Sequence, residues 1–347
     1  MSWASAVYSK KAVMRAGETL IDETATEEEH SQAMDVLSNW RAAHAYPMHS
    51  LLMTLRQKSV EIDKDAVVVQ RLKRTPSILD KLERYPEMKL HRMQDISGCR
   101  AIVKTVRDVE RLDLSIRDSR TRHTLHKVHN YITEPKDSGY RGIHLVYKYN
   151  GTKTEYQDYF VELQLRSKIQ HAWATAVEIV DTFTKQALKS SRGKQEWLDF
   201  FIYAAAQFAK LESRPVGTIA EGLDSHSELM RLEKKLNVVT RLNAFAVSAE
   251  HMTKKKNGKT DYFLLELTDH ARQIIVTQYV QSSFERATQN YLEKEKQAKI
   301  DPTYDVVLVA ASSMHALKRA YPNYFADSKD FIKYIQRVLH PAIGASR

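Results

Sequence analysis

The sequence predicts an α/β (or α+β) protein in which a mixed β-sheet is flanked by helices. Short segments that are β-branched or alternate apolar and polar residues recur between residues 66 and 167, as is typical of strands. Longer segments with apolar residues at helical spacing precede and follow them. Glycine and proline are sparse, at 10 and 8 of 347 residues, which favours long elements with few turns.

Residues 1–60 predict a group of N-terminal helices, because Ala33, Leu37, Trp40 and Ala43 recur at helical spacing and form one apolar face. From about residue 66 the pattern changes to strands with connecting helices. Four segments predict strands: DAVVVQRLKR, GCRAIVKTV, GIHLVYKYNG and DYFVELQLRS. A helix with an apolar stripe follows in QHAWATAVEIVDTFTKQALK, and we expect this second unit to cover residues 61–190.

A helical connector over residues 191–240 is expected to lead to a C-terminal unit at 241–347. This unit predicts strand, helix, strand and helix in DYFLLELT, SSFERATQNYLEKEKQAK, YDVVLVAAS and the segment from SMHALKRAYP onward. Asn-Gly within KKKNGK suits the positive φ of a tight turn, so an exposed hairpin is predicted around residues 254–259. The C-terminal unit therefore predicts a small α/β domain.

The charge and cysteine content restrict the class of protein. Lys and Arg outnumber Asp and Glu by 53 to 43, and the net charge of +10 favours a polyanionic partner, although a basic balance also serves solubility alone. Cys99 is the single cysteine, which excludes a disulfide framework or a cysteine-rich zinc site in this sequence. With neither an export signal nor an apolar run of membrane-spanning length, we expect a cytoplasmic protein without a membrane partner.

One predicted strand has a polar face of unusual composition. Because strand side chains alternate, YFVELQLRS places Phe160, Glu162, Gln164 and Arg166 on one side and apolar residues on the other. Upstream, residues 71–107 hold 10 Lys and Arg against 4 Asp and Glu, an excess that suits phosphate chains. The alternative is that the polar face of this strand is simply exposed to solvent.

Asp95 and Glu162 both lie at the edges of predicted strands, which allows them to converge on one Mg²⁺ held together with substrate phosphates. The alternative for Asp95 is the capping of a helix or turn. The sequence therefore indicates a site for phosphate chemistry, without deciding between these alternatives.

Four ordered motifs, RLKRTPSILDK, DISGCRAIV, YITEPKDSGYRGIHLVY and VELQLRSKIQHAWA, resemble those of the RelA/SpoT alarmone synthetase domain over residues 60–190. The resemblance implies a nucleotidyltransferase-like fold and transfer of pyrophosphate from ATP to a ribose 3′-hydroxyl. It implies that Mg²⁺ is held by Asp95 and Glu162, and that Glu162 takes the proton of the attacking hydroxyl.

The resemblance also implies two groups of binding residues. Those for ATP are Arg71, which would stack on adenine, and the phosphate ligands Lys73, Lys81 and Arg100. Those for the acceptor are Lys136, Tyr140, Arg141, His144, Gln164 and Arg166, with Tyr140 stacking on the acceptor base and Ser138-Gly139 turning the backbone beneath them. His129 and Asn130 depart from the basic residue and Asp that the family usually carries, which bears on the identity of the acceptor.

The C-terminal unit resembles the antitoxin domain of the CapRel group of fused toxin–antitoxin synthetases, a pseudo-zinc finger without zinc. The resemblance implies pyrophosphorylation of the 3′-CCA end of tRNA, inhibition by the C-terminal domain, and release by a phage protein such as a capsid protein. It implies that Tyr321 and Tyr324 of YPNY plug the ATP pocket. Physically, a tyrosine ring could stack on the Arg71 guanidinium, whereas the alternative is that both rings pack within their own domain.

The leading hypothesis is thus a tRNA pyrophosphotransferase toxin with a built-in antitoxin, active in abortive defence against phage. The first alternative is a (p)ppGpp or (p)ppApp synthetase that uses free GDP, GTP or adenosine nucleotides. A second alternative is an inactive module that binds RNA, against which the presence of both Asp95 and Glu162 argues.

Overall fold

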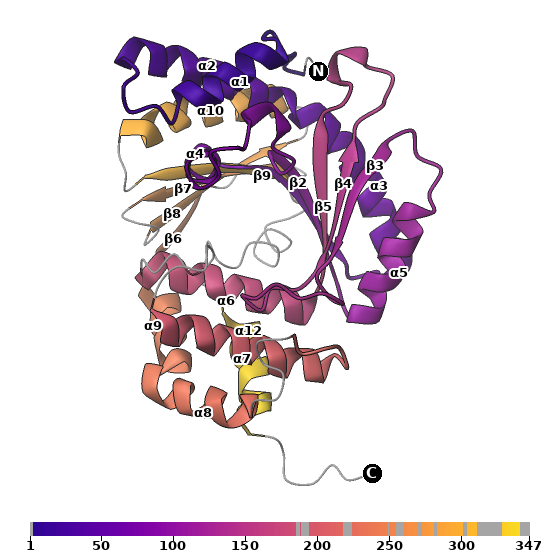
Figure 1. The fold of residues 1–347 in the computed structure, drawn as a ribbon, viewed down its shortest axis with the longest axis vertical. Coiled ribbons are helices and arrows are strands. Elements are labelled where there is room, and N and C mark those ends of the chain that lie inside the picture. The colour runs from indigo at the N-terminus through magenta and orange to yellow at the C-terminus, as the bar shows by residue number, and fades with distance from the viewer. Residues whose placement is uncertain are drawn as a thin grey trace.

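The computed structural model describes residues 3–184, 188, 194–217, 224–248, 250–254, 260–268, 273–280, 283–300, 304–310 and 328–340. Within these residues, nine strands form one mixed sheet in the order β3-β4-β5-β2-β1-β9-β7-β8-β6 (Figure 1). The predicted fold class, a mixed sheet flanked by helices, is confirmed.

The strands β1 to β5 come from the first half of the chain. They are β1 (Val67–Leu72), β2 (Ser97–Val103), β3 (Thr124–Asn130), β4 (Ile143–Lys148) and β5 (Phe160–Ser167). β2 and β5 run parallel, whereas β1–β2, β4–β5 and β3–β4 are antiparallel. All four strands predicted between residues 66 and 167 are present.

The other strands come from the C-terminal part: β6 (Glu250–Lys254), β7 (Thr260–Thr268), β8 (Gln273–Val280) and β9 (Asp305–Ala310). β9 pairs antiparallel with β7 over six residues and with β1 over only two, Gln70 with Ala310 and Arg71 with Val309. The two groups of strands are therefore joined by a short ladder. The predicted boundaries at residues 60, 190 and 240 stay predictions.

Helices cover both faces of the sheet (Figure 1). On one face lie α1 (Lys10–Thr19), α2 (Glu27–Ala43), α3 (Ala45–Ile62), α5 (Val106–Arg117) and α10 (Phe284–Ile300). On the other lies α6 (Lys168–Thr184), backed by α7 (Gln195–Leu211), α8 (Ser225–Leu236), α9 (Val238–Ser248) and α12 (Lys329–Leu339). The short α4 (Thr75–Arg84) follows β1 directly.

The predicted N-terminal helices form, and their apolar stripe is buried. Thr26 and Glu29 make a capping box that satisfies the first backbone N–H groups of α2. Leu37 and Trp40 then face a core shared with α3 and the sheet. A separate cluster packs α6 against α7, α8 and α12 around Phe200. The first cluster therefore packs the N-terminal helices on the sheet, whereas the second packs the later helices on one another.

The C-terminal unit differs from the predicted strand-helix-strand-helix order, because β6 and β8 were not predicted. The hairpin around KKKNGK is wrong as a pairing: β6 and β7 are not neighbours, since β8 lies between them, parallel to β6 and antiparallel to β7. Asn-Gly favours a local turn, but strand pairing is decided by non-local packing. No helix in the described part of the chain is both long and apolar enough to cross a membrane.

Candidate active site

A cavity of about 580 Å³ lies between the strands β1, β2, β4 and β5 and the helices α6 and α7. We call it the basic cavity, because cations from several elements line it. They are Arg71, Lys73, Lys81, Arg100, Lys136 and Arg166. Its volume is within the range of about 300 to 1,000 Å³ that is typical of small-molecule sites.

The polar face of β5 forms the floor of the basic cavity. Val161, Leu163 and Leu165 are buried in the core, whereas Glu162 and Gln164 on the opposite face line the cavity. The register sets Glu162 beside Gly98 of β2, and it sets Gln164 between Arg100 and His144. Gly98 has no side chain, so the carboxylate of Glu162 is left accessible from this side.

Asp95 lies just before β2 and is held by two lysines. Its carboxylate oxygens pair with Lys73 Nζ at 2.9 Å and with Lys81 Nζ at 2.8 Å. Burial raises the pKa of Asp95, but the two ammonium groups outweigh burial and lower it below its usual value. Asp95 is therefore ionised at neutral pH. The two lysines that pair with it could also bind a phosphate group, which would compete with the carboxylate for them.

A second chain of contacts joins Tyr140, His144 and Glu162. His144 Nδ1 lies 2.9 Å from Glu162 Oε1, and the Tyr140 hydroxyl lies 2.5 Å from His144 Nε2. Gln164 donates to the other Glu162 oxygen at 2.6 Å, and Arg166 donates to Gln164 at 3.2 Å. The carboxylate is thus bound on one oxygen by β4 and on the other by its own strand, β5.

The protonation states follow from these contacts. Burial lowers the pKa of His144, but Tyr140 and Glu162 outweigh burial and raise it to about 9. Burial raises the pKa of Glu162, whereas His144 and Gln164 hold it far below its usual range. Burial likewise raises the pKa of Tyr140, but Arg166 and His144 bring it down to about 8. At neutral pH His144 and Glu162 therefore form an ion pair, and Tyr140 is an acid near its titration point.

Aromatic rings and cations alternate along the loop between β3 and β4. Lys136 Nζ lies 4.5 Å from the centre of the Tyr131 ring and 5.4 Å from that of Tyr140. The Arg166 guanidinium lies 5.1 Å from the Tyr140 ring centre. These cation–π contacts are each worth about 0.5 to 2 kcal/mol and fix the orientation of the rings. The loop thereby presents flat faces and positive charge on one side of the cavity.

The turn at Ser138-Gly139 brings this loop against α7. Gly139 has φ +87°, a conformation that favours glycine, and a Cβ there would lie 2.7 Å from the Ala205 Cβ. The prediction that this pair turns the backbone is confirmed. Only glycine gives both the turn and the close approach.

The described residues predicted for the site lie together, with one exception. Those that line the basic cavity are Arg71, Lys73, Lys81, Asp95, Arg100, Lys136, Tyr140, His144, Glu162, Gln164 and Arg166. The exception is Arg141, which is only 4% exposed and lines a separate small space with Glu212 beside α6 and α7. Neighbouring residues of extended backbone point to opposite sides, so Tyr140 faces the cavity and Arg141 faces away.

Arg141 is therefore corrected as a cavity residue: in this structure its guanidinium contacts the Ile132 carbonyl at 3.4 Å, and burial lowers its pKa to about 10. Tyr321 and Tyr324, predicted to plug the ATP pocket, lie outside the described residues. The roles of the other predicted residues stay predictions.

Sequence reasoning missed several aromatic or polar groups of the cavity wall, among them Gln94, Tyr131 and Trp173. Tyr131 stands in the same motif as Lys136 and Tyr140, so its position was a usable signal. Trp173 belongs to the predicted helix QHAWATAVEIVDTFTKQALK, and it is buried while also lining the cavity. Only tertiary packing decides that one residue belongs both to the core and to the cavity wall.

The donor set was tested for a divalent cation. No group of three or more metal-ligating side chains occurs among the described residues, so a cation cage made by the protein alone is not found there. Asp95 and Glu162 line one cavity and lie close enough that the charge of Glu162 raises the pKa of Asp95. Two carboxylates fit Mg²⁺, which is commonly bound by one or two carboxylates together with substrate phosphates.

Comparison with known proteins points to the same segment. Residues 70–181, from β1 to α6, match the family model described as a region found in RelA / SpoT proteins. A curated relative, GTP pyrophosphokinase YjbM of Bacillus subtilis (strain 168), is 35% identical over 119 residues, which is 31% of this chain and 52% of the relative. The chain therefore spans about half the length of this relative.

Solved structures are similar over about half of the chain. Small alarmone synthetase 1 from Bacillus subtilis, bound to its product pppGpp, is 25% identical, with a TM-score of 0.42 over 48% of this chain and 88% of that one. A GTP pyrophosphokinase family protein from Streptococcus pneumoniae is 24% identical, with a TM-score of 0.41 over 48% and 85% of the two chains.

Proposed function

Because residues 70–181 form a RelA/SpoT-type region, we propose that this protein is an ATP-dependent pyrophosphotransferase of the RelA/SpoT synthetase type. The observation that carries the proposal is that Asp95 and Glu162 line one cavity whose walls hold Arg71, Lys73 and Lys81. Phosphoryl-type transfer depends chiefly on positioning and on neutralising negative charge, which is what this set of residues supplies.

In the proposed reaction, ATP lies against the β1–α4 side of the cavity. Arg71 stacks on adenine, while Lys73, Lys81 and Arg100 contact the phosphates. Asp95 and Glu162 hold Mg²⁺ together with the phosphates, and the ion supplies neutralisation of charge on the transferred group. The lysines that pair with Asp95 in this structure are within reach of the same space, so phosphate competes with the carboxylate for them.

The acceptor hydroxyl lies on the β4–β5 side. Its oxygen attacks the β-phosphorus of ATP, the bond from that phosphorus to the α,β-bridging oxygen breaks, and AMP leaves. The pyrophosphate is then ester-linked to the 3′-oxygen, and the hydroxyl proton goes to Glu162. Since His144 lowers the pKa of Glu162, Glu162 becomes a stronger base when the His144 imidazolium loses its proton.

For the acceptor, we propose the 3′-CCA end of tRNA, with free GDP, GTP or adenosine nucleotides as the alternative. Support for a nucleic-acid acceptor comes from the net charge of +10 and from the stacked rings of His129 and Tyr131, whose centres are 5.4 Å apart with planes 7° apart. His129 stands where the family usually carries another residue, and it lines the cavity.

We further propose that the C-terminal unit restrains this activity as an antitoxin, as in the CapRel group, until a phage protein engages it. Two contacts support this idea. β9 pairs with Arg71 in β1, and Glu295 of α10 accepts a hydrogen bond of 2.8 Å from Thr75, two residues after the ATP-side lysine Lys73. A shift of the C-terminal unit would therefore change contacts made by β1 and Thr75, beside the proposed ATP pocket.

Transfer of label from ATP that is radiolabelled in its β- and γ-phosphates tests the reaction. The full-length protein with Mg²⁺ is expected to label tRNA, and Asp95→Asn is expected to abolish labelling. Asp118→Asn, an exposed carboxylate at the end of α5, is the matched control and should retain activity. Label on GDP or GTP with unlabelled tRNA would favour the alternative. No label on any acceptor, from either the unmodified chain or the Tyr324→Ala variant in which the proposed restraint is removed, would reject the enzymatic proposal.

The same assay tests the restraint. Tyr324→Ala is expected to raise labelling at least several-fold and to make expression toxic, and a second substitution, Asp95→Asn, should relieve that toxicity. Activity equal to that of the unmodified chain would argue against the tyrosine plug while leaving the transfer reaction standing.

A further inference from the structure

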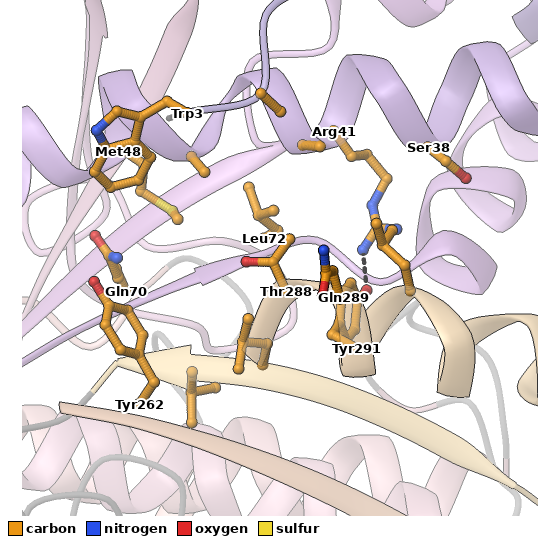
Figure 2. A pocket seen from close by; sticks show the side chains of 16 residues that line it. Trp3, Ser38, Arg41, Met48, Gln70, Leu72, Tyr262, Thr288, Gln289 and Tyr291 are labelled. Atoms are coloured by element: carbon orange, nitrogen blue, oxygen red, sulfur yellow. Dashed lines mark hydrogen bonds between the residues drawn. The ribbon is translucent and has the colours of Figure 1, made fainter. Parts of the chain in front are cut away.

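Arg41 is a buried cation of α2 that joins two distant parts of the molecule. It is 2% exposed and lies beside Tyr291 of α10, in the wall of a cavity between the N-terminal helices and the C-terminal unit (Figure 2). Its Nη2 donates to the Tyr291 hydroxyl, and its Nη1 pairs with Glu295 of the same helix at 2.5 Å. Its Nε donates to the Lys73 carbonyl at 2.9 Å, and Nη1 also donates to the Thr75 hydroxyl at 3.0 Å. One guanidinium thus links α10 to the turn between β1 and α4.

On the α10 side, the contacts of this guanidinium converge on one carboxylate. Glu295 Oε1 accepts a hydrogen bond from Thr75 at 2.8 Å and one from Tyr291 at 2.9 Å, in addition to the bond from Arg41. Burial raises the pKa of Tyr291 to about 12, so the hydroxyl keeps the proton that it donates. All four residues are buried, so the loss of one contact leaves a polar group without a partner.

Lys73 lies in the turn itself, and distant segments bind both of its backbone polar groups. Its N–H donates to the Ile96 carbonyl at 2.7 Å, and its carbonyl accepts from Arg41. Its ammonium group pairs with Asp95 in the basic cavity at 2.9 Å. Because a guanidinium is a planar and rigid fork of donors, a displaced contact with α10 turns its Nε–H group away from the Lys73 carbonyl. The position of α10 is therefore coupled to the position of Lys73.

We propose that Arg41 is a positioning residue for the ATP side of the basic cavity, and that Tyr291 and Glu295 of the C-terminal unit hold it where it aligns Lys73. This inference rests on the proposed function, in which Lys73 contacts the phosphates of ATP. It gives the C-terminal unit a second role, because α10 supports the ATP side whereas the proposed plug blocks it. Release of the restraint then has to leave α10 in contact with Arg41.

Tyr291→Phe is the main test variant, because it removes one hydroxyl from the network and keeps the ring beside Arg41. Tyr304→Phe is the matched control: Tyr304 is also buried in the C-terminal unit, but its hydroxyl donates at 2.7 Å to Glu266 of β7. Kinetics are measured in full-length chains that also carry Tyr324→Ala, so that the proposed plug does not enter the comparison. Tyr291→Phe should raise KM for ATP about five- to tenfold and leave KM for tRNA, or for GTP if GTP is the labelled acceptor, unchanged. The control should change neither KM.

A second variant separates positioning from stability. Arg41→Met combined with Glu295→Met removes both buried charges, so the fold contains no unpaired cation at this point. The Lys73 carbonyl has nevertheless lost its donor, so KM for ATP should stay raised at least about fivefold while urea unfolding shows a stable fold. A merely structural role of Arg41 would give an unchanged KM for ATP in this stable variant.

Hydrogen exchange of the free protein, followed by mass spectrometry, reports on the same turn without a substrate. Peptides that cover residues 71–77 should exchange faster in Tyr291→Phe than in the unmodified chain or in Tyr304→Phe. Equal exchange in all three chains would overturn the inference, and so would an unchanged KM for ATP in both Tyr291→Phe and the double Met variant. If no acceptor is labelled even in Tyr324→Ala, the proposed function fails, and the exchange measurement alone decides whether α10 positions this turn through Arg41.

Discussion

The buried ion pair between Arg41 and Glu295 gives the sharpest stability prediction. The two side chains are 2% and 9% exposed, and Glu295 Oε1 also accepts from Thr75 at 2.8 Å and from Tyr291 at 2.9 Å. Glu295→Gln keeps the volume and one acceptor but leaves the Arg41 cation buried without a counter-charge. Breaking one partner of a buried pair costs about 3 to 5 kcal/mol, and we expect about 3 kcal/mol because the amide oxygen still accepts hydrogen bonds.

Urea unfolding followed by circular dichroism measures this change as a loss in the free energy of unfolding. Glu293→Gln on the same helix, where the side chain is exposed, is the matched control and should stay within about 0.5 kcal/mol of the unmodified chain. The double variant Arg41→Met with Glu295→Met should recover most of the loss, because removing both charges also removes the unpaired cation. A cost for Glu295→Gln no larger than that of the control would refute the reasoning.

Three further predictions concern the basic cavity. His144 has a pKa raised from 6.5 to about 9, so its ion pair stabilises the fold fully below about pH 6.5 and loses that contribution as pH rises through 9. Nitrogen NMR of the ring should show titration near pH 9, moving to lower pH in Tyr140→Phe; unchanged titration would contradict the contact. Gly139→Ala should lower the free energy of unfolding in urea by about 1 to 3 kcal/mol, because φ is +87° and the added Cβ would lie 2.7 Å from the Ala205 Cβ; a neutral effect would contradict this packing. Asp95→Asn should reduce pyrophosphate transfer at least a hundredfold while its circular dichroism spectrum stays unchanged, and retained transfer would remove Asp95 from the proposed site.

The floor of the basic cavity was predictable because strand geometry reports which side chains share a face. The period of two in β5 identified Glu162 and Gln164 as neighbours on one side, and the structure buries the alternate residues. What the pattern could not supply is the register with β2 and β4. That register, rather than any local signal, sets His144 beside Gln164 and builds the chain from Tyr140 to Glu162.

The rest of the fold and of the site could not be predicted, because it depends on pairings between segments that are distant in the sequence. The Asn-Gly signal favours a turn in isolation, yet β8 separates the two strands that flank it. The segment QIIVTQYV of β8 is β-branched and was a usable strand signal that the interpretation passed over. For Arg141, the residue type fits a phosphate ligand, but its direction depends on the backbone of the loop, which turns the guanidinium toward α6 and α7.

The ion pair at Arg41 joins residues 254 positions apart, and this distance has a consequence during synthesis. The segment that builds the floor of the basic cavity leaves the ribosome long before α10 does. Synthesis of the roughly 130 residues between Arg166 and Glu295 takes on the order of ten seconds at about 5 to 20 residues per second. For that time the nascent chain holds its N-terminal helices and cavity strands without the last partner of Arg41. A restraint exerted by the C-terminal unit would thus begin only late in translation, on each new chain.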